Sequence, residues 1–238
     1  MLRALDQGIW VAEQPLRFLG VEVGARMTVI RLADGRLLVH SPIRRVPERL
    51  AAVQALGEVA ALIAPNRFHH LFAADWLAAC PGARLYLAPG LAVKRPDLAG
   101  AGLLSDEPEA LWQGALEQVV VRGLPMVNEV VFFHPASRTL IATDLAFHIG
   151  PEAPAPTRLF IRLTGRYGEL APTVVERLLT RDRAAFRASL ERILAWPFER
   201  VIVAHGTILE RDGRGALARG YDWLLGESYA GVDARPGA

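Results

Sequence analysis

Histidine and aspartate side chains stand at the ends of four apolar runs of the sequence. Each run has the length of a buried strand, and the polar residues that follow are His40, His69, His70, Asp144 and His205. Ligands of α/β proteins bind beyond the carboxyl ends of strands, so these side chains are expected to converge on one cleft. Imidazole and carboxylate groups are ligands that zinc, iron and manganese accept. The pattern therefore predicts a metal site.

A simpler interpretation exists for each of these residues taken alone. A single histidine at a strand end is more often a hydrogen-bonded loop residue than a ligand, and Asp144 could cap a helical turn. The recurrence of such residues at the same place in each strand unit favours the joint site. Two further residues are expected to do no chemistry: His134 lies in a hairpin turn, and Cys80 is expected to be a small buried apolar side chain.

The cysteine content limits what the metal site can be. Cys80 is the only cysteine of the chain, so intramolecular disulfides and zinc sites built from several thiolates are excluded. Any metal site must therefore consist of histidine, aspartate and glutamate side chains.

The elements that position these residues begin with an antiparallel hairpin. Asp34-Gly35 is a strong tight-turn signal between two apolar runs, Met27–Leu32 and Arg36–His40. The chain then alternates between helical and strand patterns, which argues for a sheet covered by helices. The expected elements are a strand at Gly8–Ala12, a helix at Val46–Leu56, a strand at Val59–Ala64, a helix at Leu71–Ala79 and a strand at Leu85–Ala88.

The second half of the chain repeats the hairpin and then becomes more helical. Phe186, Leu190 and Ile193 fall on one face of a helix, for which Asp182 is a candidate cap. We also expect a helical stretch at Glu107–Leu111, strands at Gln118–Arg122, Glu129–Phe133, Thr139–Thr143 and Val201–Ala204, a helix at Ala216–Leu225, and a frayed tail after Tyr229.

Composition favours one globular domain that comprises residues 1–238. Hydrophobic residues make up 52% of the 238 residues and charged residues 22%, which is a globular balance. Apolar runs are too short to span a bilayer, and the N-terminal residues do not form a signal peptide, so we expect a cytoplasmic protein without a membrane partner. The net charge is +2 and the charges alternate in sign, which argues against nucleic-acid binding. A small-molecule substrate or ligand remains as the expected partner; the sequence predicts no oligomeric state.

The order of these elements resembles the metallo-β-lactamase superfamily. An initial hairpin is followed by a strand, a histidine-rich loop and a helix; a second hairpin then ends at Asp144, and a late strand ends at His205. The resemblance runs from about residue 8 to residue 206. It implies the α/β class and a four-layer αββα sandwich. Within the superfamily, the chain looks most like an uncharacterised family with a degenerate metal motif.

The main motif of the superfamily, His-x-His-x-Asp-His, falls on the stretch Pro65–His70. Its first two histidines fall on Pro65 and Arg67, its aspartate falls on His69, and its last histidine is kept as His70. The bridging aspartate of the superfamily matches Asp144, and the closing histidine matches His205. The middle histidine falls near Gly123-Leu124, where the chain has no histidine, and the aspartate of the early strand falls on His40.

These replacements imply that one of the two metal sites of the superfamily is lost. The ligands of the other site correspond to His69, His70, Asp144 and His205, all competent metal ligands. The resemblance thus implies one zinc, iron or manganese ion. The alternative is a metal-free descendant whose polar side chains hydrogen-bond one another.

Three further residues are candidates for the same cleft. Arg67 takes the place of a ligand of the missing metal, where a guanidinium could supply positive charge and grip a carboxylate or phosphate, or simply pair with Asp144. Asn66 and Glu129 are weaker candidates, as is His40 at the end of the first hairpin.

Two functions follow from these residues. The first is a mononuclear metal-dependent hydrolase, in which Asp144 completes the metal shell or acts as a base and Arg67 stabilises developing negative charge. The second is a non-catalytic or metal-free protein that binds an anionic small molecule in the same cleft. An iron-dependent oxidation is disfavoured, because the resemblance places that chemistry at the missing site. The substrate cannot be predicted, because the loops carry no recognisable motif.

Overall fold

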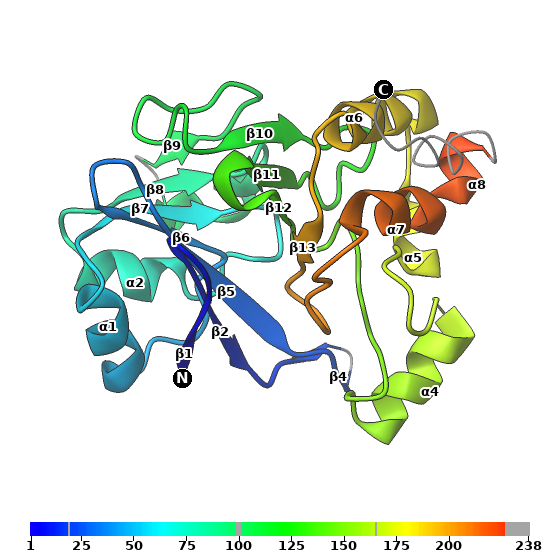
Figure 1. The fold of residues 1–238 in the computed structure, drawn as a ribbon, viewed down its shortest axis with the longest axis horizontal. Helices are drawn as coiled ribbons and strands as arrows, with labels where there is room; N and C mark the ends of the chain where they lie inside the picture. Colours follow the sequence, from blue (N-terminus) through cyan, green and yellow to red (C-terminus); the bar gives the residue numbers. More distant parts are fainter. Residues whose placement is uncertain (19, 99–100, 165, 227–238) are drawn as a thin grey trace.

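The computed structural model describes residues 1–18, 20–98, 101–164 and 166–226 (Figure 1). Within these residues the strands form two larger sheets and one short hairpin. The first sheet has the strand order β1-β2-β5-β6-β7-β8-β9, and the second has the order β10-β11-β12-β13. The hairpin pairs β3 (Arg17–Phe18) with β4 (Val21–Glu22).

The first sheet changes from antiparallel to parallel along its width. Its strands pair antiparallel from β1 to β6 and parallel from β6 to β9. The expected hairpin around Asp34-Gly35 joins β5 to β6, with Ile30 opposite Leu38. The strands are β1 (Leu2–Asp6), β2 (Ile9–Gln14), β5 (Ala25–Arg31), β6 (Leu37–His40), β7 (Val59–Ala64), β8 (Arg84–Leu87) and β9 (Gly102–Leu103).

The second sheet contains the second predicted hairpin and the late strand. β11 pairs antiparallel with β12, and β12 pairs parallel with β13. The strands are β10 (Glu117–Val120), β11 (Val130–His134), β12 (Thr139–Ile141) and β13 (Arg200–Ile202). A short 3₁₀ helix, η2 (Pro135–Ser137), makes the turn between β11 and β12.

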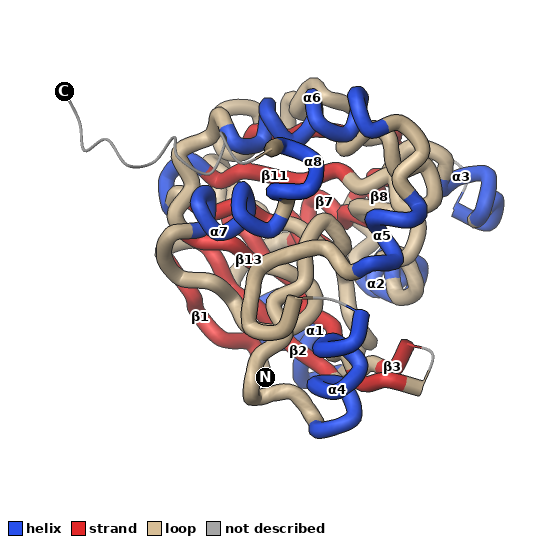
Figure 2. The backbone as a smooth tube through the Cα atoms, turned by 90° about the vertical axis from the view of Figure 1, so that its right-hand side faces the viewer, coloured by secondary structure: helices blue, strands red, loops and turns tan. Residues whose placement is uncertain are grey.

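Helices cover the outer face of each sheet, and the two sheets face each other. Figures 1 and 2 show the two groups of helices on opposite sides of the strands. The first group contains α1 (Pro47–Gln54), α2 (Ala73–Ala79) and α3 (Leu91–Lys94), followed by η1 (Pro96–Leu98). The second contains α6 (Arg183–Leu194), α7 (Gly213–Gly220) and α8 (Asp222–Leu225). The predicted four-layer αββα sandwich is confirmed.

Strand β7 shows how burial on both faces produces its uniformly apolar sequence. Every residue of Val59–Ala64 is buried. Ala61 and Ile63 belong to the core between the two sheets, whereas Leu62 and Ala64 belong to the core beneath α1 and α2. Alternate side chains of a strand point to opposite faces, so a strand between two layers needs apolar residues at every position.

Most predicted elements are present with ends shifted by at most two residues, but two predictions are wrong. Residues 107–111 form no helix; a turn spans residues 110–115 and contains the buried Trp112, whose Nε1 donates a hydrogen bond to Gln118. The single predicted helix at Ala216–Leu225 is two helices, α7 and α8, separated at Tyr221. The Tyr221 hydroxyl donates to the carbonyl of Leu145, and this hydrogen bond fixes the position of Tyr221 between the two helices. The predicted frayed tail lies outside the described residues.

Several elements had not been predicted. They include β1, the β3–β4 hairpin, β9, α3, and two helices between β12 and β13 in the chain, α4 (Ala155–Thr164) and α5 (Val174–Leu179). Among the described residues, none of the helices combines the length and the hydropathy needed to cross a bilayer.

Candidate metal centre

Three of the predicted ligands meet at one point. His69, Asp144 and His205 each direct a ligand atom into a cluster whose atoms lie within 4.8 Å of one another. The two Nε2 atoms of the histidines are 3.2 Å apart. Asp144 Oδ1 lies 3.4 Å from His69 Nε2 and 3.2 Å from His205 Nε2. All three side chains are at most 11% exposed, so the cluster is largely shielded from solvent.

The fold brings these residues together at the carboxyl ends of strands. His69 lies in the loop after β7, Asp144 follows β12, and His205 follows β13. β7 belongs to the first sheet and the other two strands to the second, so the cluster lies where the two sheets meet at one edge. This is the position that the sequence pattern predicts for ligand-binding residues of an α/β fold.

A hydrogen bond, a ring contact and contacts to the neighbouring backbone fix the position of His205. Its Nδ1 donates to the carbonyl of Gly24 at 2.7 Å, and its ring stacks on Phe147 with a centroid distance of 5.3 Å and an interplanar angle of 11°. The buried guanidinium of Arg26 donates to the carbonyls of Val203 and Gly206, on either side of His205. Gly206 has φ of +91°, and a Cβ there would lie 2.0 Å from the carbonyl oxygen of His148, so this turn requires glycine.

His69 is fixed through its other ring nitrogen and its backbone. Its Nδ1 lies 2.8 Å from the hydroxyl of Ser41, which follows β6 directly. Ser41 is buried and has φ of +53°, an uncommon conformation for serine. The side-chain oxygen of Asn66 accepts hydrogen bonds from the backbone of Phe68 and His69, which shapes the loop.

Asp144 is positioned by Asn66 and Glu129. The amide of Asn66 donates to Asp144 Oδ2 at 2.7 Å and leaves Oδ1 to face the histidines. The buried carboxylate of Glu129 accepts hydrogen bonds from the backbone of Thr143 and of Asp144, the latter at 2.8 Å. Asn66 and Glu129, which the sequence suggested as residues of the cleft, thus both contact Asp144.

Burial and the neighbouring charges set the ionisation of the cluster. Burial alone would raise the pKa of Asp144, but His69 and His205 outweigh it and hold that pKa below its usual range. Burial alone would lower the pKa of His205, but the hydrogen bond to Asp144, the charge of Asp144 and the hydrogen bond to Gly24 together outweigh burial and raise that pKa. Burial, and then the charge of Asp144, raise the pKa of Glu129 to about 7. Asp144 is therefore the anionic residue of the cluster.

The donor set fits a metal ion. A carbonyl can only accept, so the bond to Gly24 places a proton on Nδ1 of His205 and leaves the lone pair of the neutral ring on Nε2. That nitrogen, the second imidazole nitrogen and a carboxylate oxygen share a small buried volume. Such an arrangement needs a proton or a cation between the three atoms, and two imidazoles with a carboxylate form a common metal-ligand set.

Two of the predicted site residues have other partners. His70 Nδ1 accepts from Arg95 at 2.8 Å, so His70 is not part of the cluster. Burial, and then the charges of Lys94 and Arg95, lower the pKa of His70 to about 4. Arg67 donates to the carbonyl of Pro125 at 2.9 Å, and no ion pair joins it to Asp144 within the described part of the chain.

The remaining histidines of the sequence analysis are buried. His40 packs edge-on against Phe132, with ring centroids 5.5 Å apart, and its Nε2 has no hydrogen-bond partner among the described residues. His134 caps η2 by accepting from the backbone of Ser137, in agreement with the structural role expected for it. Cys80 is buried, as expected.

Four residues that support the histidines had not been predicted from the sequence: Gly24, Arg26, Ser41 and Phe147. Ser41 follows His40 directly, so its position at the same strand end was a usable signal. Arg26 carries no such signal, because it lies on β5 and contacts residues 177 and 180 positions away. Contacts of this range are set by how the two sheets pack.

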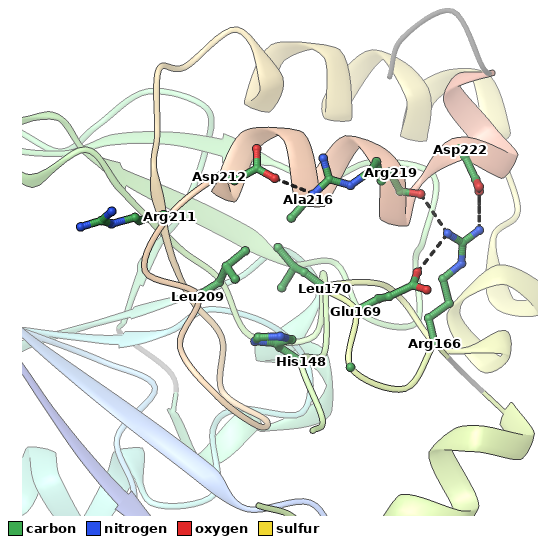
Figure 3. Close-up of a pocket in the computed structure, with 11 residues that line it drawn as sticks. His148, Arg166, Glu169, Leu170, Leu209, Arg211, Asp212, Ala216, Arg219 and Asp222 are labelled. Carbon is green, nitrogen blue, oxygen red and sulfur yellow. Dashed lines mark hydrogen bonds and ion pairs between the residues drawn. The ribbon is translucent and has the colours of Figure 1, made fainter. Parts of the chain in front are cut away.

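A cavity of the described residues lies away from the cluster. It has a volume of about 750 Å³ and is lined by residues of the loop before α5, of the loop after β13 and of α7, together with His148 and Asp222 (Figure 3). Its charged side chains are mostly paired with one another: Arg166 contacts Asp222 at 2.6 Å, and Arg219 contacts Asp212 at 2.5 Å. None of the three cluster residues lines it, so we do not assign the metal chemistry to this cavity.

Several solved structures are similar to this chain in fold. A metallo-β-lactamase from Pontibacter korlensis superposes with a TM-score of 0.64 at 12% identity, over 95% of this chain and 99% of that one. The metallo-β-lactamase FIM-1 from Pseudomonas aeruginosa, in its mono-zinc form, gives 0.59 at 11% identity, over 94% and 96%. A metal-soaked Flv1 flavodiiron core from Synechocystis sp. PCC6803 gives 0.64 at 14% identity, over 97% and 62%. The chain thus has the metallo-β-lactamase fold.

The sequence defines the family more narrowly. The chain belongs to the family described as Domain of unknown function (DUF4336), whose model matches residues 6–161. Among curated proteins, none has a significantly similar sequence.

Proposed function

We propose that this protein is a metal-dependent hydrolase that holds a single metal ion at His69, Asp144 and His205. The convergence of their ligand atoms within 4.8 Å supports this proposal most directly. Catalytic zinc sites typically use three protein ligands and leave a position open for water or substrate. Two imidazoles and a carboxylate also suit iron and manganese, so zinc, iron and manganese are the ions that we propose.

The residues around the cluster orient its two histidines for metal binding. The carbonyl of Gly24 and the hydroxyl of Ser41 engage the Nδ1 atoms of the histidines, which leaves both Nε2 atoms facing Asp144. Partners of this kind orient ligands and raise their basicity. When bound, the ion would supply Lewis acidity, which polarises a substrate oxygen and lowers the pKa of water.

Arg67 is the proposed source of further positive charge. Its Nε is buried and has no hydrogen-bond partner among the described residues, and its loop leads directly to His69. A guanidinium nitrogen without a protein partner can donate a charge-assisted hydrogen bond to a carboxylate or phosphate group. We propose that Arg67 stabilises negative charge that develops on the substrate.

Substitution of Asp144 tests the hydrolase proposal. Metal-loaded wild-type protein should hydrolyse at least one member of a panel of esters, thioesters and phosphoesters, and chelation should abolish this activity until metal is restored. Asp144→Asn should remove the activity. Asp34→Asn is the matched control, because it makes the same change in an exposed hairpin turn. Hydrolysis that survives both chelation and Asp144→Asn would contradict the proposal.

A second candidate function is metal-free binding of an anionic small molecule in the same cleft. The unpartnered Nε of Arg67 favours it, as does Lys94, whose Nζ donates to the Arg67 carbonyl at 2.7 Å. A thermal-shift screen of anions should then find one that stabilises the wild type in chelator but not Arg67→Ala. If no anion stabilises the wild type selectively, this second function is excluded.

A further inference from the structure

The apolar stripe of helix α4 faces outward. Leu159 is 59% exposed and Leu163 is 77% exposed, whereas the residues that α4 buries are Thr157 and Ile161. A surface helix normally turns its apolar stripe toward the core. Figure 1 shows α4 at the edge of the molecule, away from both sheets, and Figure 2 shows the same position from the side.

Helix α5 extends this apolar surface. None of its residues is buried, and Val174, Val175 and Leu178 are all exposed, Leu178 to 78%. Leu163 of α4 and Val174 of α5 line one small groove, so the two helices adjoin. Contiguous apolar surface of this kind marks an interaction site.

The cations of the two helices are three arginines: Arg162 and Arg177 are exposed, whereas Arg158 is half-buried and donates to the carbonyls of Pro151 and Ala153. Arg158, Arg162 and Arg177 form no ion pair with a carboxylate within the described ranges. Arg162 lies over the ring of Tyr167, and Arg177 lies over the ring of Trp223. The acid of the two helices, Glu176, is engaged in the capping box of α5. We call this surface the α4–α5 face; it consists of Leu159, Leu163, Val174, Val175, Leu178, Arg158, Arg162 and Arg177.

We propose that the α4–α5 face binds the surface of a membrane that contains anionic lipids. Leucine side chains on one side of a short helix and arginines beside them are the pattern of helices that lie in the membrane interface. Each arginine near an anionic bilayer adds to the attraction. A second copy of the chain is a poorer partner, because a two-fold contact would bring the same arginines of both copies together.

This proposal revises the expectation of no membrane partner. That expectation rested on the absence of an apolar run long enough to span a bilayer. Peripheral binding needs no such run, and the outward direction of the α4 stripe becomes visible only when the burial of each residue is known.

Vesicle binding tests the proposal. The full chain should sediment with vesicles of phosphatidylcholine and phosphatidylglycerol, and not with vesicles of phosphatidylcholine alone. The double variant Leu159→Asp and Leu163→Asp should lose at least about tenfold in partition coefficient, because both changes place charge in the apolar surface. Arg158→Gln should lose roughly fivefold, which corresponds to one cationic contact.

Leu103→Asp is the matched control. Leu103 is 62% exposed on the edge strand β9, outside the α4–α5 face, so this variant should bind vesicles like the wild type. Circular dichroism should show that all variants are folded. Failure of the wild type to bind anionic vesicles would overturn the proposal. It would also be overturned by a wild-type dimer that the double variant dissociates without any change in vesicle binding.

Discussion

The two adjacent histidines after β7 have different roles because their side chains meet different neighbours. The family motif aligns His70 with a retained ligand and His69 with a replaced aspartate. In the structure His69 joins Asp144 and His205, while His70 accepts a hydrogen bond from Arg95. In the proposed metal site, the residue that replaced the aspartate is therefore a ligand, and the retained histidine is not. Sequence alignment alone could not distinguish the two, because the direction of each side chain depends on the loop that Asn66 shapes.

His40 should make the metal-free protein sensitive to acid. Burial, and then the charge of His69, lower its pKa to about 3 in the folded state, against about 6.5 in an unfolded chain. Unfolding therefore takes up a proton at any pH between these values, and stability falls as the pH decreases through this range. Between about pH 8 and about pH 5, the loss from this one group amounts to about 2 kcal/mol.

His40→Leu tests this effect. Denaturant unfolding in chelator, at a series of pH values, should give a shallower acid dependence for the variant than for the wild type. The difference between their unfolding free energies should change by about 2 kcal/mol between about pH 8 and about pH 5. Parallel curves for the two proteins would show that His40 is not held neutral by burial.

At the scale of secondary-structure elements, the site depends on hydrogen bonds between residues of the first sheet and residues of the second. Arg26 on β5 of the first sheet donates to carbonyls on both sides of His205, which follows β13 of the second sheet. Its own charge is balanced by Glu13 on β2, with Nε 3.0 Å from Oε1. Arg26 thus positions His205, one of the three proposed metal ligands.

Arg26→Gln should therefore weaken metal binding, although all three proposed ligands are still present in this variant. Substitution of such supporting partners typically reduces metal affinity by about 10-fold to 100-fold. The measurement is the dissociation constant from competition with a chromogenic chelator. Arg31→Gln is the control, because Arg31 lies at the exposed end of the same strand. Equal affinity for Arg26→Gln and the wild type would refute the positioning role.

Elements whose apolar side chains face a core can be predicted from the sequence, whereas elements that are mostly exposed to solvent cannot. β7 and the two hairpins were recognisable because their apolar runs face a core on one or both sides. β1 is mostly exposed, and α4 and α5 direct apolar residues toward solvent, so none of them has the pattern that predicts a packed element. The candidate site was predictable at the level of strand ends, whereas its supporting contacts depend on the packing of sheet against sheet.

At the scale of the whole molecule, a metal ion that joins residues from both sheets should stabilise the entire fold. Coordination bonds to one ion would link the loop after β7 to the ends of β12 and β13. An ion present at about 100 times its dissociation constant stabilises the native state by about 2.7 kcal/mol.

For a chain of this length, this stabilisation should raise the melting temperature by roughly 5 to 10 °C. Calorimetry with and without zinc should show this rise in the wild type and little of it in His69→Ala. A zinc-independent melting temperature in the wild type would argue against a metal that connects the two sheets.

Metal content tests the central claim most directly. Untagged protein, purified without chelator, should contain about one equivalent of zinc, iron or manganese by plasma mass spectrometry, as expected for three protein ligands at a single site. His205→Ala should contain little metal, whereas His70→Ala should retain the wild-type content, because His70 lies outside the cluster. Absence of metal from the wild type, or equal loss from both variants, would contradict the assignment of His69, Asp144 and His205 as a metal centre.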